Sequence, residues 1–496
     1  MALVPLKLPA GVVRNGTQYS VGGRWFDANL VRWSSGMMLP IGGWQRQTAT
    51  TFTGVCRGLF SWRSLGIQRY LAVGTNSKLY AWNDSGTLYD ITPAGLIAGR
   101  VDAVYGLGYG TGPFGASTFG TARAASGGAI LDVATWSFDT WGEYLVAVAP
   151  HNGTIFEWAL NPASVATAVT NAPTSNLGVI VTPERHLVAL GAGGNGRKVQ
   201  WSSQEDRNQW TVTATTTAGD QELQTSGTIK AARRVRGQTL IVTDVDAHIM
   251  TYVGLPYIYG FERVGSFCGA VGANAIAAGD TFAVWMGADN FYKYDGAAGI
   301  LPCDVRDYVF GDINTNQISK VYAGANPQHS EIWWFYPSAS STENDRYVLW
   351  NYRENHWSIG QLARTAWTAG GIFRYPFAAS TDGYVYSHEQ GWTAANTPLL
   401  SARYAESGAI EIGNGDAVAV VTKLIPDEKT QGQVTMSFKT RFTPNGPEST
   451  FGPYPLDDYT DVRFTGRQAA VRVTGAADAD WRVGTPRVEA TTGGGR

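Results

Sequence analysis

The sequence predicts an all-β protein: a six- or seven-bladed β-propeller with an inserted Gly/aromatic loop and an additional C-terminal unit resembling a β-sandwich. Three observations support this prediction. Short alternating or apolar runs, separated by Gly, Asn, Asp and Ser turns, recur along most of the chain. These runs group into similar units at a spacing of about 35 to 50 residues, which is typical of propeller blades. After residue 395 this spacing ends and longer alternating runs begin.

The composition agrees with β structure. The chain has 496 residues and a mass of 53.4 kDa, which is too long for one ordinary core. It contains 60 glycines and 12% aromatic residues, but only 16% charged residues. Disordered chains are rich in charge and poor in aromatics, and coiled coils are rich in Glu, Lys and Leu, so the composition excludes both classes.

Residues 1–54 precede the first blade and are expected to form an N-terminal arm. Arginine and tryptophan alternate in it, at Arg24, Trp25, Arg32 and Trp33. A segment with this pattern has no core of its own, and guanidinium groups suit interfaces, so these four residues are candidates for docking or contact between subunits. The alternative is that the segment supplies a strand that closes the propeller.

Residues 55–395 are expected to form the propeller. Its first unit reads as four short strands over 58–62, 68–74, 78–82 and 87–91. A stack of β-sandwiches would use similar strands and is the alternative architecture. Comparable pairs of runs follow at 136–148 and 154–158, 178–190 and 198–201, 238–244 and 248–252, 280–286 and 290–296, 331–336 and 346–352, and 377–380 and 383–388.

Two segments depart from the blade pattern. Residues 98–130 form an insertion whose centre, 104–128, is rich in glycine and aromatics and cannot form a helix. It is either a flexible surface loop or a finger that orders only against neighbouring copies. Residues 396–496 carry longer alternating strands and are expected to form a separate β domain. The aromatic residues of the insertion are Tyr105, Tyr109, Phe114 and Phe119.

Charge and targeting features narrow the function classes. The 38 basic and 40 acidic residues leave a net charge of −2, so no basic surplus is available to grip nucleic acid by its phosphates. No uncharged apolar run reaches the length of a membrane span, and Pro5 and Pro9 argue against a signal peptide. Cys56, Cys268 and Cys303 have no metal-ligand spacing and are expected to be reduced thiols.

Catalytic signatures are scarce. The run Gly191-Ala-Gly-Gly-Asn-Gly matches GxGxxG, but a strand rather than a helix is expected after it, so a hairpin turn is the preferred interpretation. No catalytic residue, cofactor site or metal site is predicted, and the chain is expected not to be an enzyme. Carboxylates on turns could serve a propeller glycosidase, although solvated turns are the preferred explanation of all of them; they are Asp244, Asp246, Asp289, Glu205 and Asp206.

Several stretches resemble tail nozzle proteins of short-tailed bacteriophages, the group that includes tail tubular protein B and the packaged-DNA stabilisation proteins. The resemblance extends over most of the chain, and its motifs are structural rather than catalytic. Only the insertion at 104–128 departs from it in detail. The stretches that carry it are Leu8-Pro-Ala-Gly-Val-Val-Arg-Asn-Gly-Thr-Gln-Tyr, Gly23-Arg-Trp-Phe-Asp-Ala-Asn-Leu-Val-Arg-Trp, Leu39-Pro-Ile-Gly-Gly-Trp, Trp201-Ser-Ser-Gln-Glu-Asp-Arg-Asn-Gln-Trp-Thr, Ala218-Gly-Asp-Gln-Glu-Leu-Gln, Gly254-Leu-Pro-Tyr-Ile-Tyr-Gly-Phe-Glu, Val305-Arg-Asp-Tyr-Val-Phe, Phe442-Thr-Pro-Asn-Gly-Pro-Glu-Ser-Thr-Phe-Gly-Pro-Tyr and Asp478-Ala-Asp-Trp-Arg-Val-Gly.

The resemblance implies a structural virion protein, made in the bacterial host cytoplasm and placed in the tail. It implies a homohexameric ring below an adaptor or tail-tube ring, with tail fibres or spikes at its side. Genomic double-stranded DNA would pass through the lumen without sequence-specific binding, and the ring would retain it until ejection. The insertion 98–130 would then be a nozzle tip or gate, with Tyr105, Tyr109, Phe114 and Phe119 as candidate gate or lumen residues. The alternative is a propeller carbohydrate-binding protein or glycosidase, which would need two or three carboxylates and several arginines at one axial mouth.

Overall fold

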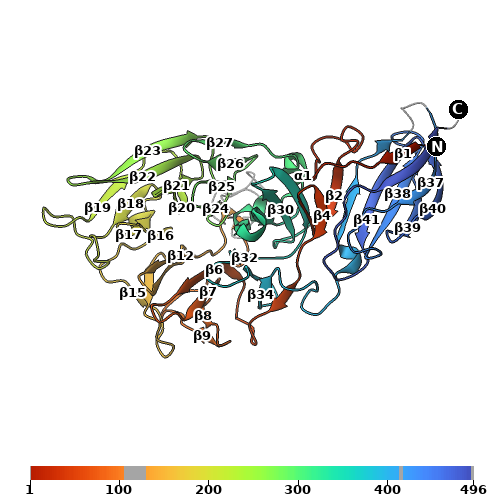
Figure 1. Cartoon of the computed structure of the whole chain (residues 1–496). Helices are drawn as coiled ribbons and strands as arrows, with labels where there is room; N and C mark the ends of the chain where they lie inside the picture. The colour runs from red at the N-terminus through yellow and green to blue at the C-terminus, as the bar shows by residue number, and fades with distance from the viewer. Residues whose placement is uncertain (1, 106–129, 413–416, 493–496) are drawn as a thin grey trace, which may run out of the picture.

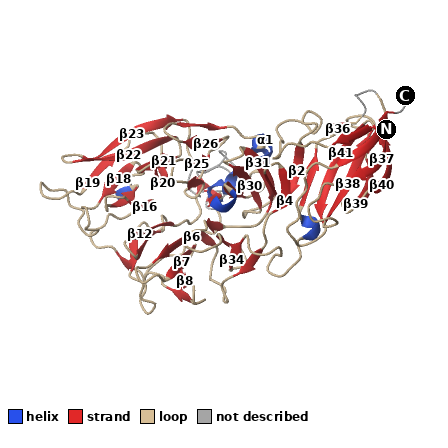
Figure 2. Ribbon diagram, viewed as in Figure 1, coloured by secondary structure: helices blue, strands red, loops and turns tan. Residues whose placement is uncertain are grey.

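Seven four-stranded antiparallel sheets form a β-propeller, and two further sheets form a sandwich beside it, in a computed structural model (Figure 1). The structure describes residues 2–105, 130–412 and 417–492. Strands account for most of its regular structure, and helices are short (Figure 2). The predicted fold class is therefore confirmed, with seven blades in the described part of the chain.

The first four blades follow one another along the chain. Each is a meander in which consecutive strands pair antiparallel, as expected for runs joined by Gly, Asn and Asp turns. Their strands are β6 (Cys56–Arg63), β7 (Arg69–Thr75), β8 (Leu79–Asn83) and β9 (Leu88–Asp90); β12 (Ser137–Trp141), β13 (Tyr144–Val148), β14 (Ile155–Trp158) and β15 (Thr167–Ala168); β16 (Gly178–Val181), β17 (Leu187–Leu190), β18 (Lys198–Trp201) and β19 (Gly219–Glu222); and β20 (Ile229–Val235), β21 (Gln238–Thr243), β22 (Asp246–Gly254) and β23 (Ile258–Ser266).

The last blade takes its outermost strand from the N-terminal segment. β5 (Trp44–Arg46) pairs with β34, so a strand from the start of the chain closes the ring. The remaining strands of blades five to seven are β24 (Ile276–Ala278), β25 (Ala283–Met286), β26 (Phe291–Tyr294) and β27 (Ala298–Leu301); β28 (Tyr322–Asn326), β29 (Glu331–Tyr336), β30 (Arg346–Asn351) and β31 (His356–Gln361); and β32 (Ala366–Thr368), β33 (Phe377–Ala379) and β34 (Val385–His388).

The sandwich contains strands from both ends of the chain. β1 pairs with β42 and β2 pairs with β35, so both termini lie at the same end of the molecule (Figure 1). One sheet has the order β1 (Ala2–Pro5), β42 (Arg487–Thr492), β37 (Ala419–Ile425), β40 (Thr460–Gly466). The other has the order β2 (Trp25–Asn29), β35 (Tyr404–Ser407), β41 (Gln468–Gly475), β38 (Val434–Arg441), β39 (Ser449–Pro455), with β36 (Ile410–Glu411) beside β41.

Short elements occupy the connections. β3 (Val31–Ser34) and β4 (Met37–Pro40) form a hairpin between the propeller and the sandwich, and β10 (Val104–Tyr105) pairs with β11 (Ile130–Leu131) at the base of the insertion. The helical turns are α1 (Arg306–Asp312), η1 (Ala192–Gly194), η2 (Thr315–Lys320), η3 (Pro327–His329) and η4 (Leu400–Ala402). η1 lies in the β17–β18 turn and β18 follows it, so the interpretation of the glycine run as a hairpin turn is confirmed.

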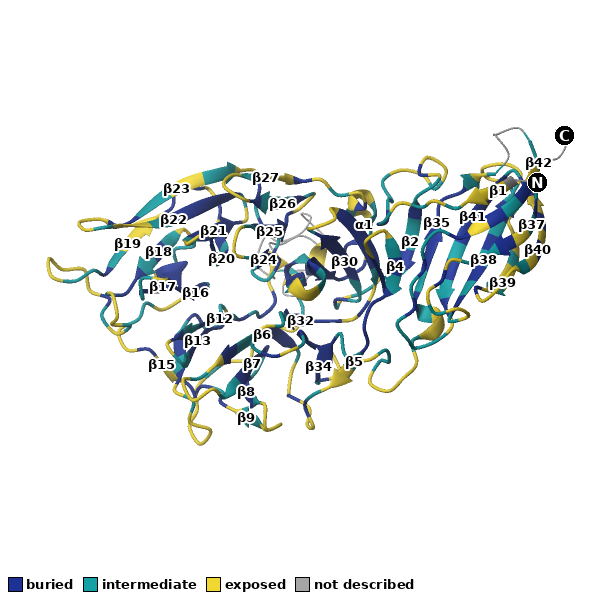
Figure 3. Cartoon of the chain, viewed as in Figure 1, coloured by how far each residue is buried: buried dark blue, intermediate teal, exposed yellow. Residues whose placement is uncertain are grey.

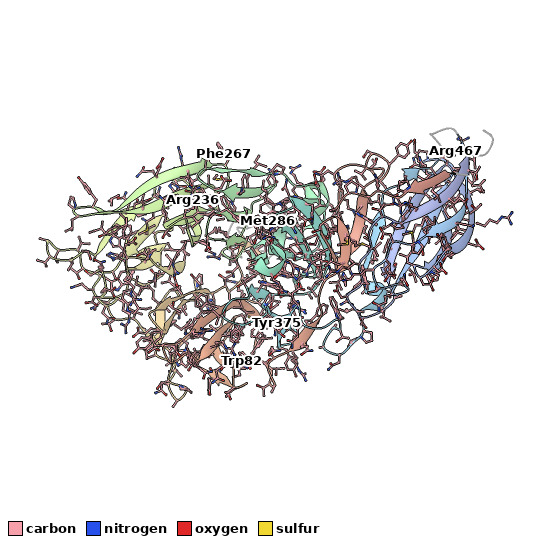
Figure 4. All side chains as sticks on the ribbon, viewed as in Figure 1. Trp82, Arg236, Phe267, Met286, Tyr375 and Arg467 are labelled. Carbon is pink, nitrogen blue, oxygen red and sulfur yellow. The ribbon has the colours of Figure 1, made fainter. Side chains whose placement is uncertain are left out.

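Apolar clusters between neighbouring blades hold the propeller together. Buried side chains line the blade strands and exposed ones lie at the turns (Figure 3). Trp82, labelled in Figure 4, packs on Phe373 and Phe377 and so joins the first blade to the last. Another cluster runs without interruption from blades five and six through Trp25 and Trp33 into the sandwich core. Propeller and sandwich therefore share one continuous core. None of the described helices is long and apolar enough for a bilayer crossing.

Candidate functional site

The axis of the propeller holds a cavity of about 380 Å³. Residues of all seven inner strands or of the loops leading into them line it, and neighbouring inner strands touch one another all the way around. Aromatic rings of Phe60, Trp136, Phe138, Tyr322 and Trp367 form much of its wall. Propellers generally place their ligand contacts where several blades converge, so this cavity is the first candidate site.

Four charged side chains line the cavity, and three of them are cationic. β20 contributes Lys230, Arg233 and Arg234, while β12 contributes Asp139, which is 4% exposed. Arg234 forms an ion pair with Asp139 and donates through Nε to the Val181 carbonyl at 2.7 Å. The cavity thus carries an excess of positive charge, and it lacks the two or three carboxylates that a glycosidase would place there.

Arg233 differs from the other two cations of the cavity because it pairs with no carboxylate among the described residues. Its guanidinium donates to the carbonyls of Ala232 at 2.9 Å and of Ala273 and Ile276 at 3.3 Å. Burial lowers the pKa of Arg233, and Tyr322 and Asp139 oppose that effect only in part. A guanidinium has five N–H groups, so one held by three carbonyls keeps donor capacity.

The base of the insertion contacts the fourth blade and the connection between the fifth and sixth blades. Ala103 exchanges hydrogen bonds with the Gln317 side chain, at 3.0 and 2.9 Å, and the Tyr105 hydroxyl donates to Asn316 at 2.6 Å. On the returning strand, Asp132 lies 3.5 Å from Lys230. Of the candidate gate residues, Tyr105 lies at this base, and Tyr109, Phe114 and Phe119 lie outside the described residues. Their role as a gate stays a prediction.

The candidate docking residues lie largely inside the chain. Trp25, Arg32 and Trp33 are 6%, 2% and 1% exposed, and Arg24 is half-buried. The two tryptophans belong to the shared core of propeller and sandwich. The N-terminal segment that carries them therefore packs between the two domains. A role in contact between subunits stays a prediction, and three of these side chains offer almost no surface to a second chain.

Arg32 is bound by two buried carboxylates. Its Nε and Nη2 donate to Glu331 at 2.8 and 3.0 Å, and its Nη1 donates to Glu389 at 2.9 Å. Trp333 donates to Glu331 at 3.0 Å, and Asn326 donates to Glu389 at 3.0 Å. This triad of Arg32, Glu331 and Glu389 ties the N-terminal hairpin to the last two blades.

Burial raises the pKa of Glu331 to about 7, against the lowering effect of Arg32. Burial acts on Glu389 in the same direction, but Arg32, the nearby His329 and the Gly42 N–H hold the pKa of Glu389 below its usual range. Burial and Arg32 together lower the pKa of His329, 3.6 Å from Glu389, to about 4. Because one cation faces two carboxylates, the neutral arrangement keeps a proton on Glu331.

Replacing Glu331 by glutamine is expected to remove a pH-dependent part of the stability. The pKa of Glu331 is raised on folding, so its contribution is present below about pH 4.5 and is lost as the pH rises through about 7. The difference in unfolding free energy between wild type and Glu331→Gln should therefore fall by roughly 2.5 kcal/mol between pH 5 and pH 8. His329 and Glu389 are present in both proteins, so the difference isolates Glu331. Urea unfolding at each pH measures it, with the exposed Glu205→Gln as control; a flat difference contradicts the assignment.

The turn carboxylates do not form a shared site in the described structure. Asp246 accepts hydrogen bonds from Thr225 and Thr243, at 2.8 and 2.7 Å, and lies 3.1 Å from His248. The other four lie on turns and have separate partners. Asp244 accepts a hydrogen bond from the Thr228 N–H, and Glu205 forms an ion pair with Arg185. Asp206 accepts from the Asn208 N–H, and the backbone carbonyl of Asp289 accepts from Arg306. No group of three or more His, Cys, Asp or Glu side chains suited to a metal occurs among the described residues.

The axial cations were not singled out from the sequence. Lys230-Ala-Ala-Arg-Arg places three cations within five residues of a chain with only 16% charged residues, and this local density is the signal that marks them. The run lies on β20, the inner strand of its blade, and this position brings the three side chains to the axis of the propeller.

No family model and no curated protein matches this chain. Solved β-propeller structures do resemble it. Virginiamycin B lyase from Staphylococcus aureus is 8% identical with a TM-score of 0.43, over 70% of this chain and 98% of its own. The WD40 propeller domain of Doa1 is 9% identical with a TM-score of 0.39, over 70% and 97%. A quinonprotein alcohol dehydrogenase-like protein from Bacteroides thetaiotaomicron is 12% identical with a TM-score of 0.36, over 69% and 76%.

These neighbours correct the prediction that the chain is not an enzyme. A lyase and an alcohol dehydrogenase-like protein are among the propellers it resembles, so the lack of a catalytic motif is no ground for excluding an activity. At this level of identity the likeness concerns the fold alone, and it assigns no particular reaction to this chain.

Proposed function

We propose that this chain is a structural subunit of the tail nozzle of a short-tailed bacteriophage. In this proposal six copies form a ring that extends the DNA channel, retains the packaged genome and conducts it on ejection. The partners would be an adaptor or tail-tube ring above and tail fibres or spikes at the side. The protein would be made in the bacterial host cytoplasm and reside in the virion tail.

The observation that carries the proposal is the resemblance of the stretches along the chain to nozzle proteins. The shared core of propeller and sandwich supports it, because a ring that withstands the pressure of a packaged genome needs subunits whose domains do not move apart. Trp25 and Trp33 provide that joint, and the buried triad of Arg32 reinforces it. The net charge of −2 also fits a duct, since DNA must move through it without being held.

The carbohydrate-related alternative receives no specific support from the axial cavity. One carboxylate and three cationic side chains make up its charged lining. A glycosidase needs at least two carboxylates at its site.

A premature stop codon in the gene of a phage that encodes this chain tests the proposal. Particles made in a non-suppressing host should have filled heads that lose their DNA and should fail to infect, and wild-type protein supplied from a plasmid should restore both properties. Immunogold labelling should place the chain at the tail tip of normal virions. Mutant particles that retain DNA and infect normally, or virions without the protein, would contradict the proposal.

A further inference from the structure

The axial cavity combines a volume of about 380 Å³ with an excess of positive charge. Lys230, Arg233 and Arg234 face it from one strand, and Asp139 is the one carboxylate among its lining residues. Arg234 is already paired with Asp139, and Lys230 has only the exposed Asp132 within ion-pair distance, at 3.5 Å. The charge of Arg233 is therefore not balanced by a neighbouring carboxylate.

Three buried arginines of this protein are neutralised by carboxylates, whereas a fourth, Arg364, donates to His388 and to the Ala363 carbonyl instead. Arg32 binds Glu331 and Glu389, Arg57 binds Glu343, and Arg403 binds Asp478. Each of these pairs joins segments distant in the sequence, which explains why a buried charge is retained there. Arg233 instead links its strand to backbone carbonyls at the next blade. A neutral hydrogen-bond donor could make these contacts, so they do not explain a positive charge at this position.

The guanidinium of Arg233 also has donors to spare. An arginine carries five N–H groups, and three of them are used here, on the carbonyls of Ala232, Ala273 and Ile276. The planar fork suits two oxygens of a carboxylate or phosphate group. Because the Arg233 side chain is partly buried, water screens its charge less than the charge of a fully exposed arginine, which favours an anion bound there.

We propose that the axial cavity binds a small oxyanion, a phosphate or carboxylate group, on Arg233. Lys230 and Arg234 raise the positive potential around it, and aromatic side chains form part of the wall. The volume of about 380 Å³ lies in the range of small-molecule sites, which excludes a DNA duplex and admits a molecule the size of a small phosphate ester or tricarboxylate. This site is independent of the proposed nozzle function.

Calorimetric titration of the full chain with inorganic phosphate, and in a second arm with citrate, tests the proposal at constant ionic strength. Wild-type protein should bind at least one of the two, and the arm that binds more tightly identifies the class of anion. Arg233→Met should weaken binding by about tenfold or more. Arg236→Met is the matched control: this arginine lies three residues further along the chain, beyond the end of β20, and is exposed (Figure 4).

Lys230→Met provides a second variant in case Arg233→Met fails to fold. Lys230 is only partly buried, and its replacement should weaken anion binding by about threefold, because it contributes through charge at a distance. Saturable binding that Arg233→Met or Lys230→Met weakens and Arg236→Met leaves unchanged supports the site. The absence of binding in both arms, or equal binding by wild type and both cavity variants, overturns it.

Discussion

Arg32→Met is expected to lower the unfolding free energy by about 3 to 5 kcal/mol, because it leaves the buried Glu389 carboxylate without its cation and removes two hydrogen-bond donors from the buried Glu331. Glu331 is 1% exposed, and the side chain of Glu389 is 5% exposed, so water cannot replace the lost hydrogen bonds. The variant should also separate the N-terminal hairpin from the last two blades, since Arg32 is the charged link between them. Urea unfolding followed by tryptophan fluorescence measures the change.

Arg69→Met is the matched control. Arg69 forms an ion pair with Asp84 at 2.9 Å, but the two side chains are 39% and 29% exposed. Exposed pairs contribute little, so this variant should lose no more than about 1 kcal/mol. Equal losses in the two variants would contradict the importance assigned to the buried triad.

Gly269→Ala is expected to destabilise the protein by more than about 4 kcal/mol or to prevent folding. A Cβ at this position would lie 1.9 Å from the carbonyl oxygen of Asp244 and 2.0 Å from its carbonyl carbon. These are backbone atoms, which cannot rotate away. Gly269 lies between Cys268 and Ala270, whose N–H groups bond to the β21–β22 turn at 3.0 and 2.9 Å, so the connection from the fourth blade to the fifth would be forced apart.

Gly299→Ala serves as the control for this change. Gly299 is also in a blade, on β27, but a Cβ there would meet no atom within 4 Å. Its replacement should change stability by no more than about 0.5 kcal/mol. Thermal unfolding of both variants by circular dichroism gives the comparison, and similar midpoints would show that the close approach at Gly269 is not real.

The blades were predictable from sequence because each one is a local meander. Runs such as Glu331–Tyr336 and Arg346–Asn351 lie close together in the chain, and the turns between them carry their own signals. β5 was harder to predict, since three residues give no period and their partner β34 lies more than three hundred residues away. The pairing of β1 with β42 could not be predicted either, because these strands lie at opposite ends of the chain.

The functional residues were less predictable for a related reason. Arg32 and Trp33 stood out in the sequence, but the pattern could not reveal that Glu331 and Glu389 would bury the charge or that the sandwich would cover the ring. Arg233 gave only a weak compositional signal. Its significance depends on seven inner strands converging on one axis, which no local pattern encodes.

The mass of the assembled species tests the central claim, that this chain is a ring subunit of a tail nozzle. Native mass spectrometry would be applied to the purified protein and to the species released from virion tails after mild crosslinking. The account predicts a complex of six copies, about six times the 53.4 kDa of one chain, at least in the tail-derived sample. A 53.4 kDa monomer in both samples would contradict it.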